Sequence, residues 1–363
     1  MPTDLLSSIR GAAPRRPAAA RLALVLLVGV LLSCVPTTPS SAPFPSPSWA
    51  IPTPTGGSTQ AAWAALYLHG AEGAPDYDAG PKTLALALAS LPGRDLFADR
   101  SDWTGPIKWS PSGAHALIAE RHGGVYVFDP AGPLRKVADN ATSTWGWIGD
   151  AAVGTVRQLG GAAGLRNVLE KVELSSSRLS ERPVPAGVVM GEFSADGRFL
   201  AYTEPGPHSP TPSFLLDVTT LETRTLGLGA RPRGWLKDGR LLVLRDEGST
   251  SSAELINPID LKTARLLSPA LDAIASPGSD YVAVVGGTRS IWTFQGGAAL
   301  ERGMDMPEGA ALLSISATGD LVSYSQRISR FPSGDRARTG VLLLGFGRVI
   351  PACDEGCSEL ALR

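Results

Sequence analysis

Four arginines in one short stretch of the chain are its strongest candidates for binding chemistry. They lie in the segment 325–340, which reads SQRISRFPSGDRARTG, and are Arg327, Arg330, Arg336 and Arg338. A guanidinium group is a planar fork of hydrogen-bond donors and suits carboxylate or phosphate groups. Only one acidic residue, Asp335, lies among them, and the Pro and Gly residues predict a long loop. The segment is therefore either a binding site for an anionic partner or an ordinary solvated loop.

A search for catalytic groups finds little. The four histidines, at positions 69, 115, 122 and 208, have no second histidine at metal-ligand spacing. The chain also lacks the Gly-x-Ser-x-Gly elbow of hydrolases, the phosphate-binding P-loop and the His-Glu-x-x-His motif. We therefore predict no catalytic residue, no metal and no cofactor, although residues from distant parts of the chain could still converge on one site.

Two of the three cysteines, Cys353 and Cys357, are separated only by Asp-Glu-Gly. The glycine allows so short a loop to bend, so a disulfide between them is sterically possible. In an oxidising compartment an even pair of cysteines predicts such a disulfide, with free thiols as the alternative. A metal site would need two further ligands, and no other His or Cys lies nearby.

The third cysteine ends a segment that is typical of an export signal. The positive charges that begin the segment are Arg10, Arg15, Arg16 and Arg21. The apolar run LALVLLVGVLL follows at 22–32 and is shorter than the roughly 20 residues that span a bilayer. The next residues complete Leu-Leu-Ser-Cys at 31–34, which resembles a bacterial lipobox. This resemblance implies cleavage before Cys34 and a lipid on its thiol; an uncleaved transmembrane helix and an incidental cysteine are the alternatives.

The following segment predicts a tether. Residues 34–60 are rich in Pro, Ser and Thr, with seven prolines between positions 36 and 54. Such a composition cannot form a packed core and favours an extended, polyproline-like spacer of about 3.1 Å per residue. We therefore divide the chain into a signal peptide at 1–33, a linker with a lipidated cysteine at 34–60, and a folded body at 61–363.

The composition of the whole chain excludes two classes of protein. With 43% hydrophobic residues and a net charge of −1, the chain is not wholly disordered. It also lacks the basic excess that binds nucleic acid through its phosphates. The 41 glycines and 30 prolines favour a fold of many short strands and turns.

The body contains a repeat of about 41 residues. Each unit has a leading residue, then a turn of small residues, then an apolar strand; the leading residues are Trp109, Trp147, Phe193, Trp235, Ala275 and Ile315. They are 38, 46, 42, 40 and 40 residues apart. Four short strands in a unit of this length are typical of a propeller blade. We expect the leading rings to be buried between neighbouring blades.

Two of these units, F-S-A-D-G at 193–197 and W-S-P-S-G at 109–113, resemble the TolB-type propeller repeat. The resemblance implies a single all-β propeller and says little about activity. Strand-like stretches at 63–68, 83–89 and 94–98 lack a first strand, which residues 358–362 could supply. We therefore predict seven four-stranded blades, with six blades and an extra strand pair as the alternative.

Together these features predict a membrane-anchored, extracytoplasmic lipoprotein. Its non-catalytic propeller would bind a protein or ligand at the cell envelope. The expected partners are the membrane, through the lipid on Cys34, and an envelope protein or cell-wall ligand; no nucleic acid is expected. The alternative is a propeller enzyme or carbohydrate-binding protein with a site in the central funnel. Charged residues around the axis would favour that alternative, and an apolar axis would favour the binding module.

Overall fold

The computed structural model describes most of the chain after residue 63. It covers residues 64–69, 83–88, 91–95, 103–120, 124–129, 134–139, 141–161, 164–185, 187–188, 190–204, 210–331, 334–344, 347–353 and 357–362. The predicted signal peptide, Cys34 and the linker lie outside these residues. Within them, no helix has the length and apolar character that crossing a membrane requires.

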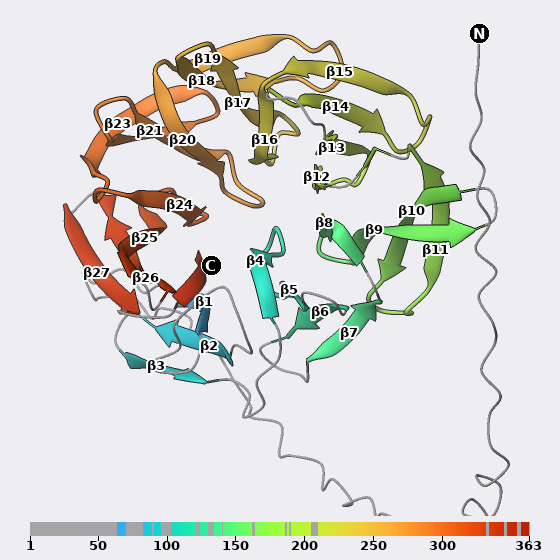
Figure 1. Cartoon of the computed structure of the whole chain (residues 1–363), viewed down its shortest axis with the longest axis horizontal. Coiled ribbons are helices and arrows are strands. Elements are labelled where there is room, and N and C mark those ends of the chain that lie inside the picture. The colour runs from blue at the N-terminus through green and yellow to red at the C-terminus, as the bar shows by residue number, and fades with distance from the viewer. Residues whose placement is uncertain are drawn as a thin grey trace, which may run out of the picture. The chain divides into compact units, whose positions relative to one another are not determined.

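These residues form 28 strands in seven four-stranded sheets, which are arranged around a central axis (Figure 1). From the axis outward, the first blade contains β28 (Cys357–Leu362), β1 (Ala64–His69), β2 (Thr83–Leu88) and β3 (Leu91–Asp95). The second contains β4 (Trp103–Trp109), β5 (Ala116–Glu120), β6 (Val125–Phe128) and β7 (Arg135–Ala138). The third contains β8 (Ala141–Ile148), β9 (Ala152–Gly161), β10 (Gly164–Glu173) and β11 (Leu179–Val184).

The remaining four blades follow the same order from the axis outward. The fourth contains β12 (Met190–Phe193), β13 (Phe199–Thr203), β14 (Pro212–Asp217) and β15 (Thr223–Leu228). The fifth contains β16 (Ala230–Trp235), β17 (Leu241–Glu247), β18 (Thr250–Ile256) and β19 (Thr263–Leu267). The sixth contains β20 (Ala270–Ala275), β21 (Tyr281–Gly286), β22 (Ser290–Gln295) and β23 (Ala298–Asp305). The seventh contains β24 (Ala310–Ile315), β25 (Leu321–Phe331), β26 (Gly334–Leu343) and β27 (Arg348–Cys353). The prediction of a single all-β propeller with four-stranded blades is confirmed.

Each predicted repeat starts at the end of an inner strand. All six leading residues are buried there, with exposed fractions between 1% and 7%. In the fourth blade the turn that follows is held by Ser194, whose hydroxyl donates to Asp196 Oδ1 (2.6 Å) and accepts from the N–H of Phe199 (2.9 Å). Gly197 completes the turn at φ 69°, a conformation that favours glycine.

The leading tryptophans connect neighbouring blades. Trp147 Nε1 donates to the carbonyl oxygen of Lys108 on β4 (2.8 Å), and Trp235 Nε1 donates to that of Glu192 on β12 (2.9 Å). Each indole therefore fills the space between two blades and also satisfies a carbonyl of the neighbouring inner strand.

The last strand of the chain closes the ring. β28 pairs with β1 in antiparallel register, with Ala65 opposite Leu362 and Tyr67 opposite Leu360. The second blade holds β28 through Trp109, whose Nε1 donates to the carbonyl oxygen of Ala361 (2.9 Å). The seventh blade holds it through Ser323, whose hydroxyl donates to the carbonyl oxygen of Leu360 (2.7 Å). The predicted closing strand is confirmed, and with it the sheet order gives seven blades.

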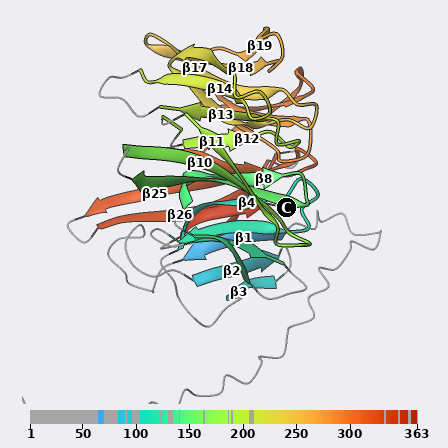
Figure 2. The same cartoon turned by 90° about the vertical axis from the view of Figure 1, so that its right-hand side faces the viewer.

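The Arg-rich segment is not a loop. Residues 325–340 belong to the long hairpin of β25 and β26, in which Arg327 pairs with Ala337 and Gln326 with Arg338. Pairing continues to Phe331 and Gly334, which leaves only two residues between the strands. Figure 2 shows this hairpin and β10 extending toward the same side of the propeller. The loop prediction was wrong because strands pair through backbone hydrogen bonds. Polar residues can make these bonds without the alternation of apolar and polar side chains that marks a strand in the sequence.

Arginines on outer strands also connect blades. Arg135, Arg182 and Arg224 donate to backbone carbonyl oxygens in a turn of the following blade, at Leu174, Val218 and Pro258, over 2.7–2.9 Å. Part of the arginine content of the chain is therefore structural.

Candidate functional site

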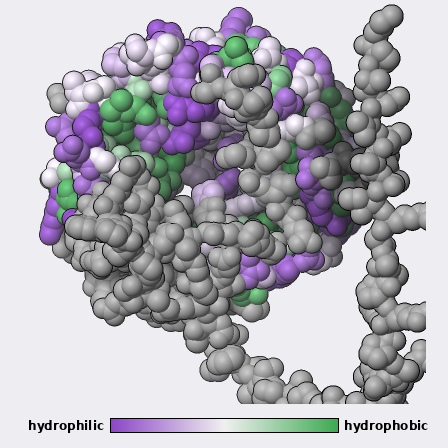
Figure 3. Space-filling view, viewed as in Figure 1, coloured by the Kyte–Doolittle hydropathy of each residue, from purple (hydrophilic) through white to green (hydrophobic). Residues whose placement is uncertain are grey.

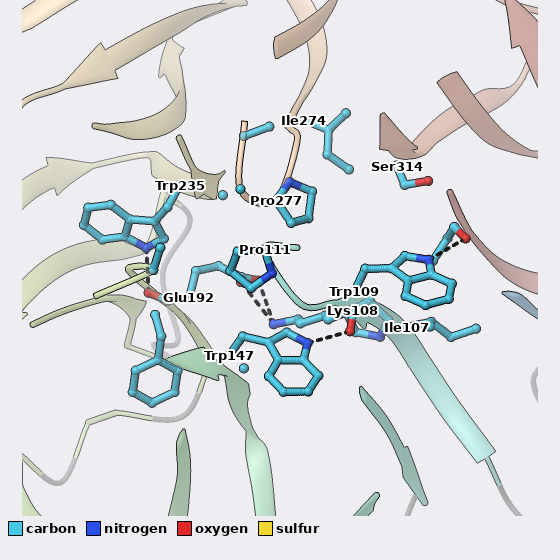
Figure 4. Close-up of a pocket in the computed structure, with 18 of the residues that line it drawn as sticks. Ile107, Lys108, Trp109, Pro111, Trp147, Glu192, Trp235, Ile274, Pro277 and Ser314 are labelled. Atoms are coloured by element: carbon cyan, nitrogen blue, oxygen red, sulfur yellow. Dashed lines mark hydrogen bonds and ion pairs between the residues drawn. The ribbon is translucent and has the colours of Figure 1, made fainter. Parts of the chain in front are cut away.

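A cavity of about 190 Å³ lies on the propeller axis and is called the axial pocket below (Figure 4). The inner strands of all seven blades contribute to its lining. Most of the lining is Pro, Ile, Leu, Ala, Gly and aromatic residues, and the only ionisable residues among the described lining are Lys108, Glu192 and Arg233. The axis therefore carries a small, largely apolar site with a few polar groups.

The residue before each leading residue lines the axial pocket. In the six repeats these residues are Lys108, Gly146, Glu192, Gly234, Ile274 and Ser314. Successive side chains along a strand point to opposite sides. When the leading residue packs between blades, the residue before it therefore faces the axis. Two of the six are glycine, and an added Cβ atom would lie 3.4 Å from the Phe193 ring at Gly146 and 3.1 Å from Ala275 Cβ at Gly234, so the absent side chains allow neighbouring blades to approach closely.

Bulges in the inner strands bring further residues to the axial pocket. The register shifts between Pro232 and Gly234 on β16, so Arg233 has no partner in the ladder. A similar shift on β24 leaves Leu313 unpaired. Bulges redirect side chains, and both of these residues line the axial pocket.

Two turns from well-separated blades meet at one end of the axial pocket. Gly278, in the turn of the sixth blade, lies against Pro111 in the turn of the second blade. A Cβ atom added to Gly278 would lie 2.2 Å from the carbonyl oxygen of Pro111, and Gly278 has a φ of 71°. Glycine is required here both for the backbone conformation and for this close approach.

Lys108 makes three hydrogen bonds in the axial pocket. Its Nζ donates to the carbonyl oxygen of Trp145 (2.9 Å) and to both carboxylate oxygens of Glu192 (3.1 and 3.0 Å). The same Nζ lies 5.0 Å from the centre of the Trp145 ring, within the range of a cation–π contact. These bonds link β4, β8 and β12.

Arg233 and Asp272 form a second ion pair beside the axis. Arg233 Nη2 donates to Asp272 Oδ1, and Arg233 Nε donates to the carbonyl oxygen of Ala273 (2.8 Å). Asp272 also accepts from the N–H of Ala273 (2.9 Å) and, through Oδ2, from that of Leu312 (3.0 Å). The carboxylate of Asp272 thus joins the fifth, sixth and seventh blades.

A second cavity, of about 300 Å³, lies between β7 and the outer part of the third blade. Two of its charged groups form an ion pair, because Arg157 Nη2 lies 2.5 Å from Glu170 Oε1; the same nitrogen lies 3.3 Å from Oε1 of Glu181, outside the cavity lining. Burial raises the pKa of Glu170, and the charge of Arg157 opposes this shift. We interpret this cavity as a structural contact between blades.

No group of three potential metal ligands occurs among the residues that the structure describes. On the described part of the face in Figure 3, hydrophobic residues lie in small groups separated by hydrophilic ones.

The residues predicted from sequence lie elsewhere. Arg338 is exposed on β26 and is not part of the axial pocket. Arg327, Arg330 and Arg336 belong to the same hairpin, but their side chains lie outside the described ones. Cys353 ends β27 and Cys357 begins β28; their side chains are likewise outside the description, so the disulfide stays a prediction.

The polar residues of the axial pocket were missed by sequence reasoning. Lys108 and Glu192 each stand one position before a leading residue, and Arg233 stands two positions before Trp235. Their positions in the repeat are the one signal that the sequence offers, and that signal does not show that the three residues share a pocket.

Comparisons with known proteins support the fold. No protein-family model and no curated protein sequence matches this chain. Among solved structures, the chain is similar to oligogalacturonate lyase from Vibrio parahaemolyticus, with a TM-score of 0.51, 12% identity and coverage of 70% of this chain and 78% of that chain. It is also similar to puromycin hydrolase, with a TM-score of 0.51, 17% identity and coverage of 80% and 52%.

A third similar structure is TolB from Acinetobacter baumannii, with a TM-score of 0.47, 13% identity and coverage of 83% of this chain. The chain spans 66% of the length of that TolB and about half of the length of puromycin hydrolase. At identities this low, the likeness shows the fold alone: this chain is a single β-propeller of four-stranded blades.

Proposed function

We propose that this protein is an extracytoplasmic, membrane-anchored lipoprotein whose propeller binds a ligand or partner at the cell envelope without converting it. The observation that carries the proposal is the axial pocket, which is largely apolar and whose charged side chains are held in ion pairs. Such a lining is typical of a binding site, where apolar area provides affinity and a few polar groups provide orientation.

The hydrogen bonds at the axis favour binding over catalysis. A general acid or base must reach the reacting atom with a group that can exchange its proton. Lys108 Nζ bonds to Trp145 and Glu192 within the protein, and Asp272 accepts bonds from three different residues. Both groups therefore serve to join blades.

The alternative, an enzyme or carbohydrate-binding protein with a site in the funnel, has one observation in its favour. Glu192 and Arg233 are among the residues that line the axial pocket, and their side chains are 36% and 33% exposed. Turnover of any compound that occupies the axial pocket, lost on substitution of Glu192, would establish that alternative.

The anchor is tested at Cys34. We expect Cys34→Ala to release the protein from the membrane fraction or to leave an uncleaved precursor, because the lipid supplies the membrane affinity. Fractionation of cells and the mass of the purified protein measure both outcomes. A Cys34→Ala protein that stays in the membrane with its signal removed would refute the lipoprotein proposal.

The Arg-rich hairpin is a second surface for an anionic partner. Replacing Arg327, Arg330, Arg336 and Arg338 by Ser should abolish capture of that partner, and at the exposed Arg338 the change in stability should be no more than about 0.5 kcal/mol. Cross-linking with mass spectrometry on intact cells identifies the partner, and added salt should weaken the interaction. Capture that is unchanged in the four-fold variant would exclude this surface.

A further inference from the structure

The axial pocket is bridged at one end. Gly278 and Pro111 meet there, and their blades, the sixth and the second, are three places apart in the ring. No two blades of a seven-membered ring are farther apart, so this contact crosses the axis. A long chain threaded along the axis would meet the bridge, and the axial pocket therefore suits a compact ligand.

The charges in the axial pocket are already compensated. Lys108 Nζ lies 3.0 Å from Glu192 Oε2, and Arg233 is paired with Asp272. A charged ligand would thus meet no unpaired counter-charge among the described lining residues, and it would lose hydration on entering an apolar site. A neutral ligand leaves both ion pairs intact.

The polar side chains of the lining are bonded within the protein. The hydroxyl of Ser314 accepts from the N–H of Leu362 (2.8 Å) and lies 2.5 Å from the Ser323 hydroxyl. The indoles of Trp109, Trp147 and Trp235 donate to backbone carbonyl oxygens. The lining therefore favours a ligand that needs few hydrogen bonds.

Size restricts the ligand further. The axial pocket, at about 190 Å³, is smaller than the roughly 300–1,000 Å³ of sites for drug-sized molecules. It is close to the size of an apolar cavity of about 150 Å³ that binds benzene. Its apolar walls include Ile107, Ile274 and Pro277 (Figure 4). The space thus suits a molecule with one ring and a small substituent.

We propose that the axial pocket binds an uncharged, apolar molecule of about the size of a single six-membered ring. The ligand packs against the Ile and Pro walls, and the two ion pairs stay closed beside it. This inference rests on the proposed binding function and names the ligand class of the same site.

Calorimetric titration of the full-length protein in detergent tests this proposal, with benzyl alcohol as the probe and a titration into detergent alone as the blank. We expect saturable binding of benzyl alcohol. Benzoate and benzylamine have the same ring but carry a charge near neutral pH, and glycerol is neutral but polar. Each of these three should bind about tenfold more weakly or worse, because each brings poorly compensated polar or charged groups into the site.

Matched variants locate the ligand. Ile274→Glu places an uncompensated carboxylate in the axial pocket, so it should weaken benzyl alcohol and make benzylamine the better ligand of the two. Ile259→Glu is the control, because Ile259 is 57% exposed and lies outside the axial pocket, and it should change neither affinity. Urea unfolding checks that both variants fold. Ile274→Ala removes wall contacts without adding a charge and should weaken benzyl alcohol about fourfold or more, which keeps the test valid if the Glu variant unfolds.

The proposal is overturned if benzyl alcohol shows no saturable binding at millimolar concentration. Equal affinity for benzoate or benzylamine overturns it as well, as do equal effects of the substitutions at Ile274 and Ile259. If benzyl alcohol fails while envelope partners are still captured on intact cells, only the ligand class is wrong. If nothing is captured either, or a ligand is converted, the proposed function itself fails.

Discussion

Closure of the propeller by its last strand makes Leu360 essential for stability. Its side chain is 1% exposed, and its backbone pairs with Tyr67 of β1. The substitution Leu360→Ala removes only side-chain atoms, so the hydrogen bond from Ser323 to the carbonyl oxygen of Leu360 can persist. The loss is therefore one of packing alone.

The expected cost follows from that burial. Truncation of a fully buried Leu to Ala lowers the free energy of unfolding by about 2–5 kcal/mol, from lost transfer energy and from the cavity left behind. A typical domain has about 5–15 kcal/mol in all. A single change in the last strand should thus remove a large part of the stability of the propeller.

Urea unfolding followed by tryptophan fluorescence measures this loss. Leu228→Ala is the matched control, because Leu228 ends an outer strand and is 64% exposed. We expect the control to stay within about 0.5 kcal/mol of the unchanged protein. If Leu360→Ala is as mild as Leu228→Ala, with the same dependence on urea, β28 does not close the ring and the reasoning is wrong.

Two further predictions concern turns. Gly278→Ala should destabilise the propeller more than Gly239→Ala: both glycines have positive φ, which costs an alanine about 1–2 kcal/mol, but only at position 278 would the new methyl group meet the backbone of Pro111. Equal midpoints in urea would show that the two turns do not touch. At Asp217, burial opposes ionisation, but hydrogen bonds from Thr219, Thr220 and Arg198 outweigh it and lower its pKa below 3.8. A carboxyl whose pKa is lowered by folding stabilises the fold above pH 3.8, and this stabilisation is lost as the pH falls through the folded-state pKa. The Asp217→Asn variant should therefore be less stable than the unchanged protein near neutral pH and should approach its stability in acid. Urea unfolding at a series of pH values measures this difference. A constant difference at every pH would contradict this.

The repeat could be predicted from sequence because it depends on local features. A large or apolar leading residue and a turn containing glycine recur along the chain, and both are required by the geometry of a single blade. The closing strand could be predicted as well, because the first blade lacked one strand. An open strand edge has unpaired N–H and C=O groups that can pair with another chain.

The axial pocket could not be predicted in this way. Its residues come from seven blades, and Glu192 and Arg233 look like ordinary polar strand residues until the ring brings β12 and β16 together. The bulge that redirects Arg233 depends on strand register, which a sequence repeat does not specify. The Arg-rich hairpin was predicted to be a loop for another reason. Its sequence is polar and contains Pro and Gly, yet its two strands pair through the backbone as far as Phe331 and Gly334.

The most direct test of the account asks where on the propeller a ligand binds. Ile107 and Ile274 line the axial pocket, whereas Ile259 is 57% exposed and does not. In methyl NMR spectra of the full-length protein with labelled isoleucine, the envelope ligand or partner identified by cross-linking should shift the signals of Ile107 and Ile274 and leave that of Ile259 in place. Unchanged signals from Ile107 and Ile274, with or without a shift at Ile259, would contradict binding in the axial pocket.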